Sequence, residues 1–99
     1  MERKIALVTG GGSGVGRACA AALAEAGFTL VLTGRRLAPL EEARAALAGE
    51  GHLAITADVG VEADVLALFD RIEAQFGRLD LLFNNAGVNA PAVEIDDLS

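Results

Sequence analysis

The chain has 99 residues, 53% of them hydrophobic, which is enough for the core of one domain and no more. Its formal net charge of -6 excludes a nucleic-acid-binding surface, because phosphate binding needs clustered Lys and Arg. Its one cysteine, Cys19, excludes an internal disulfide, and no apolar run approaches the roughly 18 residues that span a membrane. The composition predicts a cytoplasmic protein with neither nucleic acid nor membrane as a partner.

Apolar runs and amphipathic runs alternate along the first half of the chain. The apolar run over 4–9 predicts a buried strand, and the alanine-rich run over 15–27, which ends on a glycine, predicts a helix. β-branched and apolar residues over 28–33 predict a second strand. A proline near a first turn, followed by two glutamates, predicts a second helix over 38–49.

The second half continues the same alternation. Strands are predicted over 52–57 and 79–83, and between them the i, i+3, i+4 spacing of apolar residues predicts a helix over 61–76. Strands that alternate with helices form a parallel sheet with right-handed crossovers. The predicted fold class is therefore α/β: a Rossmann-like doubly wound sheet in three α/β/α layers, of which four strands are present.

The stretch LVTGGGSGVGRA, residues 7–18, holds five glycines in seven residues between the first predicted strand and helix. A helix N-terminus offers unpaired N–H groups and a positive dipole end, and glycines let a phosphate approach them closely. A Walker loop is excluded, because Arg17 and Ala18 stand where it needs Lys and Ser or Thr. The G-x-G-x-x-G spacing is also absent, and the pattern that fits is Thr9-Gly10-x-x-x-Gly14-x-Gly16.

This pattern resembles the first motif of the short-chain dehydrogenase/reductase family. The sequence NNAG over 84–87, after the fourth predicted strand, matches the second motif of that family. The ADV over 57–59 and Asp80 in GRLDLLFNNAG match as well. The resemblance covers essentially the whole chain. It implies the sheet order 3-2-1-4 and an NAD(P)-dependent oxidoreductase that transfers hydride between a nicotinamide cofactor and an alcohol or carbonyl substrate.

The resemblance also implies a role for each residue of the glycine loop. Gly10 would make the turn, Gly14 would admit the pyrophosphate, and Gly16 would let the helix approach the sheet. Backbone groups near Ser13 and Val15 would hold phosphate or ribose. A flexible loop without a ligand is the alternative.

Two further segments receive roles from the resemblance. Asp58 would accept a hydrogen bond from the adenine amino group, with Val59 against the ring, although Asp58 could instead, or as well, cap the following helix. The ribose and nicotinamide side of the cofactor would be lined by Asn84, Asn85, Ala86 and Gly87. A plain Asn/Gly turn is the alternative for these four residues.

The end of the second strand bears on which dinucleotide binds. NAD-binding folds place a carboxylate there to hold the ribose 2′-hydroxyl, but Gly34 takes that place and Arg35 and Arg36 follow it. A guanidinium can bind a 2′-phosphate that a carboxylate would repel. This favours NADP, with NAD still possible and two solvated loop arginines as the alternative.

The residues that carry hydride transfer in this family are a Tyr, a Lys four residues later, a Ser and an Asn. The chain has no tyrosine, and its only lysine is Lys4, so no catalytic residue is assigned within it. We therefore expect residues 1–99 to be the N-terminal half of one longer domain, inactive alone and homo-oligomeric at full length. The alternative is a non-catalytic dinucleotide-binding module complete at 99 residues, which an apolar strand exposed at the sheet edge disfavours.

Overall fold

Four parallel strands form the centre of the molecule in a computed structural model that describes residues 4–12 and 14–84. Their order is β3-β2-β1-β4. The strands are β1 (Ile5–Thr9), β2 (Thr29–Gly34), β3 (Leu53–Thr56) and β4 (Leu81–Asn84). The helices are α1 (Gly14–Glu25), α2 (Leu37–Ala45) and α3 (Glu62–Phe76).

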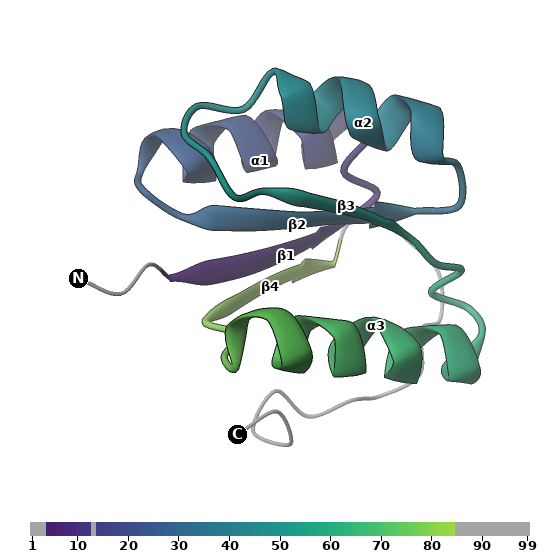
Figure 1. Cartoon of the computed structure of the whole chain (residues 1–99). Helices are drawn as coiled ribbons and strands as arrows, with labels where there is room; N and C mark the ends of the chain where they lie inside the picture. The colour runs from purple at the N-terminus through teal and green to yellow at the C-terminus, as the bar shows by residue number, and fades with distance from the viewer. Residues whose placement is uncertain (1–3, 13, 85–99) are drawn as a thin grey trace.

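The helices cover both faces of this sheet, α1 and α2 on one side and α3 on the other (Figure 1). Each strand pair is parallel, including β1 with β4, whose first partners are Ala6 and Leu81. The predicted three-layer fold and its strand order are therefore confirmed.

Strand β1 lies at the centre of the core, and all of its residues are buried. Successive side chains of a strand point to opposite faces. Ile5 and Leu7 accordingly join the cluster under α3, whereas Ala6 and Val8 join the cluster under α1 and α2. A strand that is apolar on both faces is what a central parallel strand requires, because helices dehydrate both sides.

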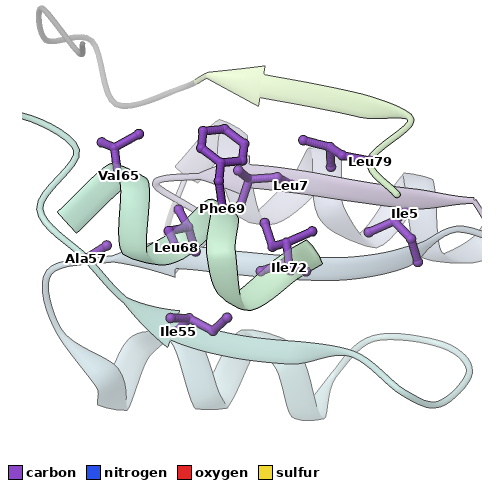
Figure 2. Close-up of a cluster of buried hydrophobic side chains, with 10 residues drawn as sticks. Ile5, Leu7, Ile55, Ala57, Val65, Leu68, Phe69, Ile72 and Leu79 are labelled. Atoms are coloured by element: carbon purple, nitrogen blue, oxygen red, sulfur yellow. The ribbon is translucent and has the colours of Figure 1, made fainter. Parts of the chain in front are cut away.

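Helix α3 contributes the larger side chains of the core. Val65, Leu68, Phe69 and Ile72 lie on one face of α3 and pack toward β1 and β3 (Figure 2). The helix ends at Gly77, whose φ of +71° is left-handed and whose N–H donates to the Glu73 carbonyl. Glycine adopts this conformation at little cost, so it defines the end of the helix.

The opposite face of the sheet is covered by smaller residues. Gly16, Ala20 and Ala24 recur at a spacing of four along α1 and are buried. This stripe lets α1 approach the strands closely, because residues four apart share one helix face. The small side chains of α1 pack in the same cluster as the buried Leu30 and Leu32 of β2.

Helix α2 is shorter than its predicted range of 38–49, because it ends at Ala45. Gly49 and Gly51 each have a φ of +86°, which a continuing right-handed helix does not allow. The alanine-rich pattern concealed this end, since alanine favours helix up to the first glycine.

His52 occupies the turn that follows α2. Its ring is buried, its Nδ1 accepts a hydrogen bond from the Leu30 N–H at 3.0 Å, and its Nε2 donates to the Ala48 carbonyl at 2.7 Å. The side chain therefore joins the chain leaving α2 to the start of β2. It lies next to the amino end of β3, as the sequence predicts.

Strand β4 begins two residues later than its predicted range of 79–83. Leu79 is buried, and the Asp80 N–H donates to the Ile5 carbonyl at 2.9 Å. The Asp80 carboxylate in turn accepts the Ile5 N–H at 2.7 Å. Leu79 is thus taken up by the core and Asp80 by its two bonds to Ile5 before the ladder starts at Leu81. In the part of the chain that the structure describes, no helix is long and apolar enough to cross a bilayer.

Candidate functional site

The glycine loop, β2 and β4 meet at the carboxyl edge of the sheet. The Gly10 N–H donates to the Thr33 carbonyl at 2.9 Å, which ties the loop to β2. On the other side, the buried Thr9 hydroxyl donates to Asn84 Oδ1 at 2.9 Å. Parallel α/β sheets bind ligands at this edge. The structure therefore brings the first motif and the start of the second motif together.

Two glycines of the loop have backbone angles that favour glycine. Gly10 has a φ of +67° and Gly14 a φ of +58°. A Cβ atom built on Gly14 would meet no atom within 4 Å, so the space beside the start of α1 is open. Val15 is 66% exposed beside it. Ser13, a predicted contact, lies outside the described residues.

Gly11 and Gly12 have a structural role that the sequence analysis missed. A Cβ on Gly11 would lie 3.0 Å from Leu32 Cδ2, and a Cβ on Gly12 would lie 2.9 Å from Pro39 Cβ. Both distances are shorter than ordinary contacts, so a side chain at either position would force Leu32 or Pro39 to shift. The motif fixes neither position, and the sequence does not show that Leu32 and Pro39 approach them.

A cavity of about 530 Å³ lies between the glycine loop and α2. The first turns of α1 and α2 carry no acidic residue, so their positive dipole ends are not neutralised there. The cavity is therefore suited to an anion. Its lining residues are Gly10, Gly12, Gly34, Arg35, Arg36, Pro39 and Leu40.

A larger cavity of about 710 Å³ lies at the amino end of the sheet. It is lined by Ile5, Thr29 and Arg78, among others, and by no residue of the two motifs. Arg78 is engaged there by Asp80, at 2.7 Å between Nη2 and Oδ1. We therefore place the candidate site at the smaller cavity.

Gly34 ends β2 at the wall of the smaller cavity. A Cβ atom there would lie 3.5 Å from Leu40 Cδ2, which is an ordinary contact. The backbone therefore has room for a side chain at position 34. Steric hindrance does not explain why a carboxylate is absent there. Arg35 and Arg36 follow and are exposed, and neither guanidinium has a hydrogen bond or ion pair within residues 4–12 and 14–84. Arg36 is the N-cap residue of α2 but makes no side-chain cap.

Asp58 lies beside Gly34, because the Ala57 N–H donates to the Gly34 carbonyl at 2.9 Å. The alternative prediction that Asp58 caps α3 is wrong. The N-cap of α3 is Val61, without a side-chain cap, and Asp58 Oδ1 instead accepts the Gly60 N–H at 2.9 Å in the preceding turn. Two residues, Val59 and Gly60, separate Asp58 from the N-cap, so its carboxylate serves the turn rather than the helix. Val59 is half-buried against the core under α3.

The remaining predicted residues divide between the two ends of the sheet. Asn84 is exposed at the carboxyl end of β4, and Asn85, Ala86 and Gly87 lie outside the described residues. Asp80 lies at the amino end, where side-chain hydrogen bonds from Arg78 hold the pKa of its carboxyl below the ordinary value of 3.8. Its role is therefore to join β4 to β1 rather than to contact a ligand at the candidate site.

Comparison with known proteins agrees with this geometry. The profile of the short chain dehydrogenase family matches residues 4–99. The 3-oxoacyl-[acyl-carrier-protein] reductase of Bos taurus is 41% identical over 86 residues, which are 87% of this chain and 36% of that protein. The chain thus spans little more than a third of that relative, and half or less of other curated relatives that it matches.

Two solved structures share both the fold and a substantial part of the sequence. L-Sorbose reductase from Gluconobacter frateurii, complexed with NADPH and L-sorbose, is 33% identical with a TM-score of 0.82, covering 94% of this chain and 36% of that one. The 3-ketoacyl-(acyl-carrier-protein) reductase from Brucella melitensis, complexed with NADH, is 38% identical with a TM-score of 0.75, covering 82% and 33%. The motifs, the sheet order and these matches lead to one conclusion: the chain belongs to the short-chain dehydrogenase/reductase family.

Proposed function

We propose that residues 1–99 form the dinucleotide-binding part of an oxidoreductase that transfers hydride between NADP and an alcohol or carbonyl substrate. The observation that carries the proposal is the cavity where the glycine loop, Gly34 and the two arginines meet. Each of these features favours a phosphorylated ligand. The alternative of a non-catalytic module has no structural observation in its favour.

The residues in the cavity and beside it would contact a dinucleotide in a definite order. Gly14 leaves open space at the start of α1, where the helix dipole and free N–H groups would hold the pyrophosphate. Gly10 would make the turn, Gly16 would let α1 approach the sheet, and backbone groups near Ser13 and Val15 would hold phosphate or ribose. When bound, the cofactor supplies the hydride chemistry.

The adenosine half would lie along the ends of β2 and β3. Arg35 would donate a hydrogen bond to a 2′-phosphate, with Arg36 as the weaker candidate. Asp58 would accept a hydrogen bond from the adenine amino group, and Val59 would lie against the adenine ring. On the other side of the loop, Asn84 and the residues after it, over 85–87, would line the nicotinamide ribose.

The preference for NADP rests on charge at the end of β2. A charge-assisted hydrogen bond contributes about 1.5–3 kcal/mol, or roughly ten- to a hundredfold in affinity. Arg35 is exposed, so water weakens its interaction and we expect the lower end of that range. Gly34 supplies no carboxylate to favour NAD.

The test measures dissociation constants of NADPH and NADH in the full-length protein at one ionic strength. We expect the wild type to prefer NADPH by about tenfold. Arg35→Ala should reduce that preference by weakening NADPH alone, and Arg36→Ala should do so less. Gly34→Asp should weaken NADPH and strengthen NADH, because its carboxylate repels the 2′-phosphate and can accept from the 2′-hydroxyl.

Arg71→Ala is the matched control. Arg71 is an exposed arginine on α3, on the opposite face of the sheet, so its loss removes the same charge without touching the cavity. It should leave both dissociation constants unchanged. Equal affinity of the wild type for NADH and NADPH would contradict the preference, and failure to bind either would contradict the proposed function.

A further inference from the structure

We propose that Asp64 is a positioning residue for adenine recognition, which it controls by holding the backbone of Asp58. This inference rests on the proposed function, since it assigns the adenine amino group to Asp58. Asp64 lies in the first turn of α3, and neither motif of the family includes it.

The link between the two aspartates is a direct hydrogen bond. Asp64 Oδ2 accepts the Asp58 N–H at 2.9 Å, and the bond is partly buried. An ionised acceptor strengthens such a bond, and partial burial reduces competition from water. Asp64 therefore fixes the backbone position from which the Asp58 side chain starts.

The rest of the turn leaves one carboxylate oxygen of Asp58 for a ligand. Asp58 Oδ1 accepts the Gly60 N–H at 2.9 Å, and the Asp58 carbonyl accepts the Val61 N–H at 2.9 Å. Within the described part of the chain, Asp58 Oδ2 has no hydrogen-bond partner. With the backbone held by Asp64 and Oδ1 held by Gly60, the direction of Oδ2 is determined before any ligand arrives.

The turn is also anchored to the strand beside it. The Ala57 N–H donates to the Gly34 carbonyl at 2.9 Å, so the residue before Asp58 is tied to the end of β2. Asp64 supplies the anchor on the α3 side. Asp58 is thus held between the strand that carries the cavity and the helix on the other face of the sheet.

Glu62 provides the matched control for this role. It lies in the same first turn of α3 and carries the same charge, but it is exposed and has no hydrogen bond or ion pair among the described residues. Substitution of either residue by alanine removes the same favourable charge from the helix N-terminus. Only substitution of Asp64 releases the Asp58 N–H.

The experiment uses NADPH and its analogue with hypoxanthine in place of adenine as paired probes, in the full-length protein. Hypoxanthine replaces the amino donor with a carbonyl oxygen, which repels a carboxylate. The ratio of the two dissociation constants therefore reports recognition of the amino group, and a general loss of stability would move both constants together. Circular dichroism confirms that each variant is folded at the temperature of measurement.

We expect the wild type to prefer the adenine dinucleotide and Asp64→Ala to reduce that preference by about two- to tenfold. Asp64→Asn keeps an acceptor oxygen and should restore most of the preference, and Glu62→Ala should leave it unchanged. Asp58→Ala should remove it.

Three results would overturn the inference, and they separate it from the proposed function. If Asp58→Ala loses the preference but Asp64→Ala keeps it, Asp64 does not position Asp58. If the wild type binds both dinucleotides equally, Asp58 does not read the amino group, although dinucleotide binding itself stands. If the wild type binds neither, the proposed function fails and the inference fails with it.

Discussion

Gly14 combines an open position with a backbone conformation that other residues rarely adopt. Its φ is +58°, while a Cβ atom would meet nothing within 4 Å. Substitution by a larger residue therefore has two separate effects. The backbone conformation becomes strained, and a side chain enters the space assigned to the pyrophosphate.

We expect Gly14→Val to weaken NADPH binding at least tenfold in the full-length protein, which corresponds to about 1.4 kcal/mol. The free energy of unfolding should also fall, by about 1–2 kcal/mol, because of the left-handed backbone. Titration calorimetry measures the first effect and urea denaturation the second.

Gly27→Val separates the two effects of that substitution. Gly27 has a φ of +100° and open space around its Cβ position, but it follows α1 at the end away from the glycine loop. Gly27→Val should lower the free energy of unfolding without changing the affinity for NADPH. A folded Gly14→Val variant that binds NADPH as tightly as Gly27→Val would contradict the phosphate role of the loop.

Asp80 gives the amino end of the sheet a defined pH dependence. Side-chain hydrogen bonds from Arg78, together with the Ile5 N–H, lower the pKa of its carboxyl below 3.8 in the folded protein. A folded-state pKa below the unfolded value means that the stabilisation is present above pH 3.8 and is lost as the pH falls through the folded-state pKa.

We therefore expect Asp80→Asn to reduce the free energy of unfolding at pH 7. The difference from the wild type should shrink as the pH falls below about 4, where protonation removes the same charge from the wild type. Urea denaturation of both proteins across this pH range measures the difference. A difference that stays constant down to pH 2 would show that the ionised carboxylate is not what stabilises the junction.

At the scale of elements, α3 owes its position to one buried face. Ile72 is fully buried beneath the helix, whereas Leu66 on the same helix is 50% exposed. Both are large aliphatic residues at interior positions of α3, and their helix propensities differ by only about a few tenths of a kcal/mol. The difference between them isolates the contribution of core packing.

We expect Ile72→Ala to lower the free energy of unfolding of the full-length protein by about 2–5 kcal/mol, because a cavity replaces the lost side chain. Leu66→Ala should change it by about 0.5 kcal/mol or less. Denaturant titration measures both losses of stability, provided that the slope of unfolding free energy against denaturant concentration is the same in each variant. An equal loss of stability in Ile72→Ala and Leu66→Ala would contradict the assignment of Ile72 to the core and of Leu66 to the surface.

At the scale of the whole molecule, the lysine and the histidine lie at the end of the sheet opposite the candidate site. Lys4 precedes β1, and His52 precedes β3, so both lie at the amino end of the sheet. Both ring nitrogens of His52 already bond to backbone groups. The loops of the candidate site lie at the carboxyl end.

We therefore expect the 99-residue chain, taken alone, to catalyse no NADPH oxidation coupled to carbonyl reduction. Reduction needs a proton donor within hydrogen-bond reach of the substrate oxygen, and the sequence contains no tyrosine. The absorbance of NADPH at 340 nm, a wavelength at which only the reduced cofactor absorbs, follows the reaction with a panel of aldehydes and ketones. The full-length protein is the positive control, and turnover by the homogeneous 99-residue chain would contradict the expectation.

The amino-acid sequence by itself determined the order of elements, the parallel sheet and the place of the two motifs. Periodicity along α3 and the apolar runs of β1 and β2 are local signals, and they are strong because one helix face or both strand faces must be buried. The ends of α2 and β4 were predicted less well. Helix α2 ends at Ala45, before the first glycine that could mark its end in the sequence. The start of β4 depends on the bonds between Asp80 and Ile5, which are far apart in the chain.

Tertiary structure alone decided which residues support the candidate site from outside the motifs. Gly11 and Gly12 lie close to Leu32 and Pro39, which a larger side chain would displace, and neither neighbour is adjacent in sequence. Asp64 holds Asp58 because α3 begins where its first turn reaches back to the preceding turn. Such contacts form because folding brings separate elements close together in space. The spacing of residues along the chain does not show which elements will meet.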